Sequence, residues 1–148
     1  MFYGVTTMRS ERLLALPLRL HGIPLGRPLD LLLDVDEWKV IGLDVLCGDD
    51  VHRFLPFPTA VVSDEEIAIR SPFVLLEEDQ LAFYRQRTVA VSGLRGEAVL
   101  RDRREVGTLE DVVVQTDGTV AALIVDGREL PVDEAVRMQS RRRVAAVS

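Results

Sequence analysis

Two stretches of this chain are similar to each other in sequence. Residues 25–33 read LGRPLDLLL and residues 106–114 read VGTLEDVVV, so each has a glycine, then an acidic residue, then an apolar run. A polar turn and a second apolar run follow both stretches, at residues 40–45 and 120–125, and each copy closes with a Leu-Pro pair. Internal similarity decides the architecture before any other feature does. We therefore expect two copies of one small β unit.

The composition is that of a globular protein with an aliphatic core. The 148 residues are 47% hydrophobic and 28% charged, which separates the chain from the polar, highly charged class of disordered proteins. Only 5% are aromatic, so Leu, Val, Ile and Ala must fill the core. Folding at this length buries roughly 70% of the surface of the unfolded chain. That is enough for one ordinary domain or two very small ones.

The charge of the chain disfavours polyanionic partners. The net charge of -6 repels nucleic acid and anionic membrane surfaces. The one dense basic run is Arg141, Arg142 and Arg143 near the C-terminus. This run is either a solvated tail or a surface that binds a partner. Nucleic acid is therefore an unfavoured partner class.

The cysteine content and the apolar runs indicate the compartment. Cys47 is the only cysteine, so no intramolecular disulfide can form, and a single thiol fits a reducing cytosol. The first residues lack a basic stretch followed by a continuous apolar run, so we expect no signal peptide. No apolar segment approaches the ~20 residues that a membrane-spanning helix needs. We expect a cytoplasmic protein without a membrane span.

Short strand patterns separated by turn residues dominate the chain. They predict strands at residues 13–23, 29–35, 39–47, 53–57, 66–69, 88–92, 97–100, 107–114, 120–125 and 129–132. Residues 76–84 predict a short helix, with acidic side chains in its first turn and Arg85 and Arg87 near its end. Asp117 and Gly118 suit a tight hairpin turn. Short strands at this spacing are typical of small barrels or sandwiches.

The second copy resembles a PRC-barrel domain over residues 94–138. The resemblance is carried by GEAV at 96–99, EVGTLEDV at 105–112, the strand at 120–125 and LPV at 130–132. The family is named for the cytoplasmic domain of the photosynthetic reaction centre H subunit, and it also occurs at the C-terminus of a ribosome maturation factor. The resemblance implies a compact six-stranded β-barrel that serves as an adaptor or docking module, with no catalytic residues to transfer.

The first copy resembles the same pattern more loosely, over residues 22–60. It differs at Pro24 and Pro28 and has an insertion around residues 48–51. The expected fold is mainly β, with two small PRC-type β-barrels related by a pseudo-twofold axis and joined by a short helix.

The expected organisation has three parts. A first, divergent PRC-barrel-like repeat occupies residues 1–75, and a connector with the short helix occupies residues 76–92. The second repeat, with its basic C-terminal tail, occupies residues 93–148.

The matched residues of the two copies suit structural roles. Gly26 and Gly107 lie where a strand must bend or where another backbone approaches closely. Asp30 and Asp111 can cap a turn or accept a hydrogen bond from a neighbouring backbone amide.

The sequence contains no catalytic constellation. His21 and His52 are not near a cysteine, serine or second histidine at the spacing of a triad or metal site, and no serine lies in a nucleophile elbow. The acidic turns lack the glycine-centred loop of a calcium site, and no phosphate-binding glycine motif occurs. We therefore predict a protein that is not an enzyme, with no catalytic, cofactor-binding or metal-binding residues.

Trp38 is the residue most suited to recognition. It lies in a predicted turn beside Lys39, the only lysine, and a tryptophan on an exposed turn can anchor an interface. The alternative is that Trp38 packs on the other barrel or covers the end of its own. The candidate partner-binding residues are Trp38, Lys39, Arg141, Arg142 and Arg143.

These observations favour a non-enzymatic docking or adaptor module with a protein partner. Two alternatives stay open: a ribosome- or RNA-associated maturation factor, and a binder of a small ligand in a cavity between the barrels. Barrels this small leave apolar surface that a homodimer could cover.

Overall fold

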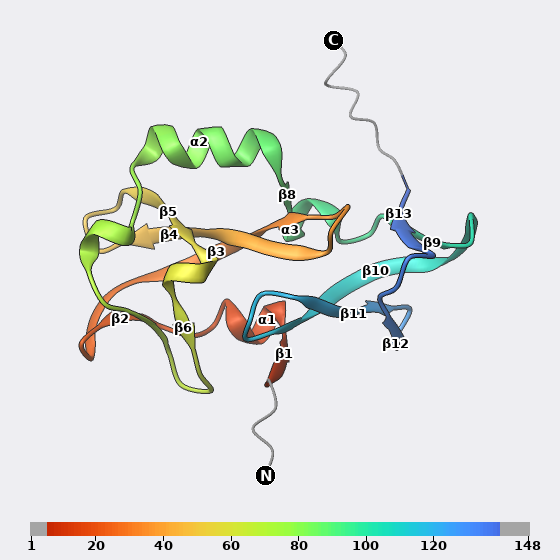
Figure 1. Ribbon diagram of the computed structural model, residues 1–148, viewed down its shortest axis with the longest axis horizontal. Helices are drawn as coiled ribbons and strands as arrows, with labels where there is room; N and C mark the ends of the chain where they lie inside the picture. Colours follow the sequence, from red (N-terminus) through yellow and green to blue (C-terminus); the bar gives the residue numbers. More distant parts are fainter. Residues whose placement is uncertain (1–5, 140–148) are drawn as a thin grey trace.

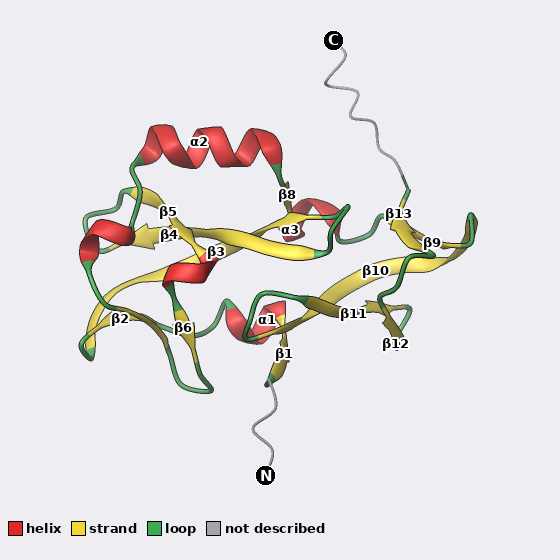
Figure 2. Ribbon diagram, viewed as in Figure 1, coloured by secondary structure: helices red, strands yellow, loops and turns green. Residues whose placement is uncertain are grey.

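The computed structural model describes residues 6–139 and is mainly β, as the sequence predicts. The strands form two sheets that lie side by side, and Figures 1 and 2 show the few helical segments around them. In the described residues both sheets follow open strand paths and neither closes into a barrel. The structure therefore confirms a mainly β fold with two sheets.

The first sheet contains seven strands from the first two thirds of the chain. In the order β5-β4-β3-β2-β7-β6, with β8 paired to β3, they are β5 (His52–Pro56), β4 (Lys39–Cys47), β3 (Ile23–Asp34), β2 (Leu18–Leu20), β7 (Ile67–Ile69), β6 (Val61–Val62) and β8 (Val89–Ala90). The β2–β7 pair is parallel and the other pairs are antiparallel.

The second sheet takes most of its strands from the last third. In the order β12-β11-β10-β9-β13, with β1 paired to β10, they are β12 (Arg128–Pro131), β11 (Val120–Val125), β10 (Arg104–Gln115), β9 (Ala98–Arg101), β13 (Val136–Met138) and β1 (Thr7–Arg9). All five pairings are antiparallel.

Helical segments connect the strands and cover one sheet. They are α1 (Ser10–Leu13), η1 (Phe57–Thr59), η2 (Pro72–Val74), α2 (Glu78–Arg87) and α3 (Val91–Leu94). Figure 1 shows α2 lying along one face of the first sheet. Leu81 of α2 packs against Leu32 and Phe54, and the rings of Phe54 and Tyr84 stack with their centroids 4.2 Å apart. This apolar contact holds α2 on the sheet.

The longest strand of each sheet matches the other position by position. β3 begins at residue 23 and β10 at residue 104, 81 positions later, and both are 12 residues long. Their patterns of burial differ at a single position, where Asp30 is half-buried and Asp111 is buried. The turns before them also match, because positive φ angles occur at His21 and Gly22 and, 81 positions later, at Asp102 and Arg103.

Each sheet pairs with a short arm, which is a strand of two or three residues followed by a helical turn. The arm formed by β1 and α1 pairs with β10 of the second sheet, where Met8 lies opposite Val114. The arm formed by β8 and α3 pairs with β3 of the first sheet, where Val89 lies opposite Leu33. The N-terminal arm, β1 and α1, therefore pairs with the second sheet, which contains the last strands of the chain.

The first arm is fastened by the buried carboxylate of Asp111, which is 4% exposed. Asp111 accepts hydrogen bonds from the Ser10 hydroxyl, from the Val112 amide at 2.7 Å and from the Glu11 amide at 3.2 Å. The Arg95 guanidinium lies 3.5 Å away and also donates to Ser10 at 2.9 Å. Every oxygen of this buried group is therefore hydrogen-bonded, as burial of a charge requires.

The second arm is fastened in the same way by Asp30, which is less buried. Asp30 accepts from the Ser92 hydroxyl, from the Ser92 amide at 3.2 Å and from the Leu31 amide at 2.9 Å. The position that matches Arg95 is Leu14, and among residues 6–139 no arginine forms an ion pair with Asp30. Both aspartates thus bind neighbouring backbone amides, as the sequence predicts.

Two backbone hydrogen bonds join the sheets at the turns between their longest strands. The Val40 amide donates to the Gly118 carbonyl at 2.8 Å, and the Val120 amide donates to the Trp38 carbonyl at 2.9 Å. The largest apolar cluster contains residues of both sheets, including Leu43 of β4 and Leu123 of β11. The two sheets therefore share one core.

The two matched glycines lie where a side chain would not fit. A Cβ on Gly26 would lie 2.4 Å from the carbonyl oxygen of Leu46 on the neighbouring strand. Gly107 has φ +147°, and a Cβ there would lie 2.4 Å from Oδ2 of Asp126. The close approach of another backbone that the sequence predicts is confirmed at Gly26, whereas at Gly107 the neighbouring atoms belong to the side chains of Val125 and Asp126.

The strand predicted at residues 13–23 is wrong in its first half. The chain forms α1 up to Leu13 and enters β2 only at Leu18. The helical turn buries Ser10 and Leu13 against the distant second sheet, a contact that local apolar patterning cannot reveal. The predicted helix at 76–84 is α2, shifted toward the C-terminus.

We predict that Asp111→Ala destabilises the protein by about 3 kcal/mol, because it leaves the buried Ser10 hydroxyl without its acceptor and removes the carboxylate that pairs with Arg95. Asp30→Ala should cost about 1 kcal/mol, since that site is more exposed and lacks an arginine. Urea unfolding followed by far-UV circular dichroism measures both. Equal losses at the two positions would contradict this account.

Candidate functional site

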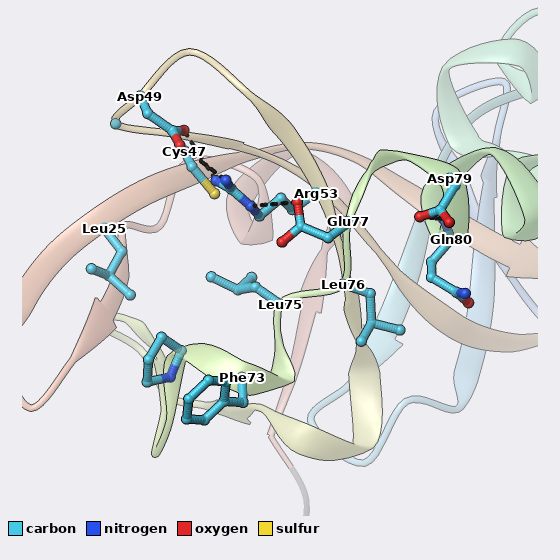
Figure 3. A pocket seen from close by; sticks show the side chains of 12 residues that line it. Leu25, Cys47, Asp49, Arg53, Phe73, Leu75, Leu76, Glu77, Asp79 and Gln80 are labelled. Atoms are coloured by element: carbon cyan, nitrogen blue, oxygen red, sulfur yellow. Dashed lines mark hydrogen bonds and ion pairs between the residues drawn. The ribbon is translucent and has the colours of Figure 1, made fainter.

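A hollow of about 800 Å³ lies at one end of the first sheet, between the β4–β5 turn, η2 and the start of α2. Its apolar floor is formed by Leu25, Leu75 and Leu76, and Phe73 stands at its edge (Figure 3). The volume lies within the range of binding pockets in proteins. We take this hollow as the candidate functional site.

Hydrogen bonds to β5 hold the floor in place. The Phe54 amide donates to the Leu76 carbonyl at 2.9 Å, and the Leu76 amide donates to the Phe54 carbonyl at 2.8 Å. This pair occupies the outer edge of β5 at Phe54. The segment that precedes α2 is therefore tied to the sheet at the point where it forms the floor.

Phe73 is the most exposed large apolar residue in the described part of the chain. Its side chain is 89% exposed, although a phenylalanine gains roughly 1.5–3 kcal/mol from burial. The η2 turn sets this orientation, because Pro72 begins the turn and the Ser71 hydroxyl accepts from the Phe73 amide at 3.1 Å. An ordered turn thus presents an aromatic ring to solvent beside an apolar hollow.

Arg53 lies above the floor and is held by two carboxylates. Its two terminal nitrogens donate to Asp49 at 3.0 and 2.9 Å, and Nε lies 3.6 Å from Glu77 (Figure 3). The thiol of the buried Cys47 lies beside the same guanidinium. The hydrogen bonds from Arg53 lower the pKa of Asp49 below its ordinary value, and Asp49 in turn raises the pKa of Arg53. The arginine is therefore a structural part of the rim.

The electrostatic balance of the hollow is negative. Asp49, Glu77 and Asp79 line it, against the single cation of Arg53. In the part of the chain that the structure describes, no cluster of three or more His, Cys, Asp or Glu side chains could hold a metal ion. The arrangement offers apolar area and negative charge.

A second cavity of about 560 Å³ lies at the junction of the two sheets. It is lined by Lys39, by Phe57 and by the stacked Phe54 and Tyr84, with Gly118 on the opposite side. A Cβ on Gly118 would lie 3.0 Å from the Phe57 ring. Glycine at this turn therefore allows the Phe57 ring to pack directly against the backbone.

The structure separates the candidate partner-binding residues of the sequence. Trp38 is 5% exposed, and its Nε1 donates to the Val136 carbonyl of the second sheet at 3.3 Å, so it packs across the junction. The adjacent Lys39 is exposed and lines the junction cavity. Arg141, Arg142 and Arg143 lie outside the described residues. Trp38 and Lys39 thus have different surroundings despite being neighbours in sequence.

Sequence reasoning missed the buried Asp44, which lies beneath α2. Its carboxylate is ion-paired with Arg85 of α2, and Nδ1 of His52 lies 3.0 Å from its other oxygen. The ion pair with Arg85 therefore holds α2 on the first sheet together with the apolar contact of Leu81. The first residues of α2 line the hollow. The signal available in the sequence is an acidic residue within the otherwise apolar run of residues 40–47.

Comparison with known proteins does not identify a family for this chain. No protein-family model matches the chain, and no curated protein matches it. None of the helices between residues 6 and 139 combines the length and apolar character needed to span a membrane.

We predict that Asp49 titrates below its ordinary pKa of 3.8 in the folded protein, because Arg53 stabilises the ionised form. A lowered folded-state pKa means that the ion pair contributes stability above the unfolded-state pKa and loses it as the pH falls through the folded-state value. Arg53→Gln should raise the Asp49 midpoint toward 3.8 in a carboxyl-carbon NMR titration.

Asp133 provides the matched control for this titration. Its pKa is lowered by the Ala135 amide and, to a smaller degree, by Arg101. Its midpoint should stay unchanged in Arg53→Gln. An Asp49 midpoint that is equally low in both proteins would show that Arg53 does not set it.

Proposed function

We propose that this chain is a non-enzymatic protein-docking module of the PRC-barrel type, built from two copies of one small β unit with exchanged arms. The strands β3 and β10 that match in length, burial and preceding turn support this proposal. So do the two arms, each fastened to the other copy by a serine and an aspartate. The shared core makes the pair a single rigid support.

The observation that carries the docking function is the exposed Phe73 ring beside an apolar, acid-rimmed hollow. Large aromatic residues held in an ordered, exposed position are typical anchors of protein interfaces. The residues that line the hollow include no serine, threonine or histidine, so no hydroxyl–imidazole pair of the kind used in acyl transfer lies there.

The hollow lies beside a turn whose length differs between the two copies. The β4–β5 turn has four residues, 48–51, whereas the β11–β12 turn has two, 126–127. The β4–β5 turn, which departs from the shared pattern, therefore contributes to the site, as expected when a common scaffold acquires a specific surface on its loops.

We predict that a photo-crosslinking phenylalanine analogue at position 73 captures a protein partner in cells of the source organism. Position 83 is the matched control, because Phe83 is 45% exposed on α2 and lies under the Arg87 guanidinium at 3.8 Å. Crosslinked species resolved by gel and mass spectrometry should appear for position 73 and be weaker or lacking for position 83. Equal labelling at both positions, or none at position 73, would contradict docking at the hollow.

The junction cavity supports a second candidate function, the binding of a small ligand between the two sheets. The cavity has apolar and aromatic walls, and the Lys39 ammonium has no ion-pair partner among residues 6–139. Asp117 also lines the cavity, but its carboxylate accepts from the Thr119 amide at 2.9 Å. A flat, singly charged anion fits these walls best.

We predict that 1-anilinonaphthalene-8-sulfonate, a flat aromatic anion, shifts the amide NMR signals of Lys39, Tyr84 and Thr119 together and saturably. Lys39→Gln should weaken that binding severalfold, because the sulfonate loses its only nearby cation in the cavity. Shifts confined to Leu25 and Phe73 would place the probe in the hollow and remove this candidate.

The ribosome- or RNA-associated alternative rests on Arg141, Arg142 and Arg143, which lie outside the described residues. The site that the structure describes is acidic and would repel RNA. A cytoplasmic location and a homodimer remain predictions from the sequence.

A further inference from the structure

We infer that the hollow beside Phe73 binds a partner segment in which basic side chains flank an apolar anchor. This inference rests on the proposed docking function and adds the chemistry of the partner.

The apolar residues of the hollow favour a partner segment that carries an apolar side chain. Leu25, Leu75 and Leu76 form the floor, and Phe73 forms one wall. Ile23 lies two residues before Leu25 in β3 and is 61% exposed. Covering Phe73 and Ile23 would remove the two most exposed large apolar side chains in the described chain from water.

The carboxylates of the hollow favour a partner segment that carries basic side chains. Asp49 and Glu77 both face Arg53, so one guanidinium serves two carboxylates. Asp79, also on the rim, accepts from the Gln80 amide at 2.9 Å and has no ion-pair partner among residues 6–139. Asp79 and the weakly held Glu77 are the carboxylates available to cations of a partner.

The same charges disfavour the other occupants. The carboxylates that line the hollow would repel the phosphate groups of a nucleic acid or an anionic membrane. A second copy carries the same net charge of -6 and would be repelled. A basic polypeptide segment both gains from the apolar floor and neutralises the rim.

The backbone of the site indicates recognition through side chains. At Phe54 the outer edge of β5 is already hydrogen-bonded to Leu76, so a partner strand cannot extend the first sheet there. Strand addition, which reads mainly the partner's backbone, is therefore blocked at the floor of the hollow. Specificity must come from the apolar anchor and the flanking charges.

Selection from a phage-displayed library of random dodecapeptides tests this inference with the full chain. Immobilised wild-type protein is the target, and Phe73→Ala protein removes peptides that bind elsewhere. Enriched peptides should carry Lys or Arg on either side of Leu, Ile, Met or Phe. Enrichment of acidic or uncharged peptides would overturn the inference.

Fluorescence polarisation of the best peptide then tests the charges. Glu77→Gln combined with Asp79→Asn should weaken binding about five- to tenfold and reduce its salt dependence, as expected for two surface ion pairs. Asp64→Asn combined with Glu65→Gln, on the exposed turn between β6 and β7, is the control and should leave the affinity unchanged. Thermal unfolding checks that both double variants fold.

The outcomes separate this inference from the proposed function. Equal affinities for wild-type and Glu77→Gln/Asp79→Asn protein would overturn the basic partner, while crosslinking at position 73 would keep the docking site. Loss of crosslinking at position 73 would remove the docking function itself. A concentration-dependent dimer that Phe73→Ala abolishes would assign the hollow to a second copy and overturn the inference as well.

Discussion

The structure depends on two backbone hydrogen bonds between the turns of its sheets. Val40 and Val120 each donate to the turn of the other sheet, so the two turns lie side by side. One turn carries Trp38, which packs into the second sheet, and the other carries Gly118. This asymmetry produces one shared core and, on the glycine side, the junction cavity.

The same residue types have different roles because their burial differs. Asp111 and Asp44 are buried, so their oxygens must be hydrogen-bonded, and each joins segments that are distant in sequence. Asp79 and Glu77 are exposed at the hollow, where solvent can hydrate their carboxylates. On this account the buried carboxylates maintain the fold, and the exposed ones are the surface that we propose for docking.

Strong local signals made part of the fold predictable. β4 and β11 have the bounds predicted from their apolar runs and polar turns, and the roles of Gly26 and Asp111 followed from matching the two copies. The segments α1 and β13 were not predicted, because three or four residues carry too little periodicity. The hollow was missed for a similar reason, since its residues come from three separate segments.

The sequence by itself determined a mainly β fold with two similar units and structural glycines, because strand patterns and turn residues act over a few neighbouring positions. Only the tertiary structure decided which sheet each arm joins, since Ser10 and Asp111 are 101 residues apart and Ser92 and Asp30 are 62 apart. It also decided that Trp38 is buried and Phe73 exposed. Whether such a side chain in a turn is buried depends on which distant segments pack against it, and the neighbouring sequence does not show this.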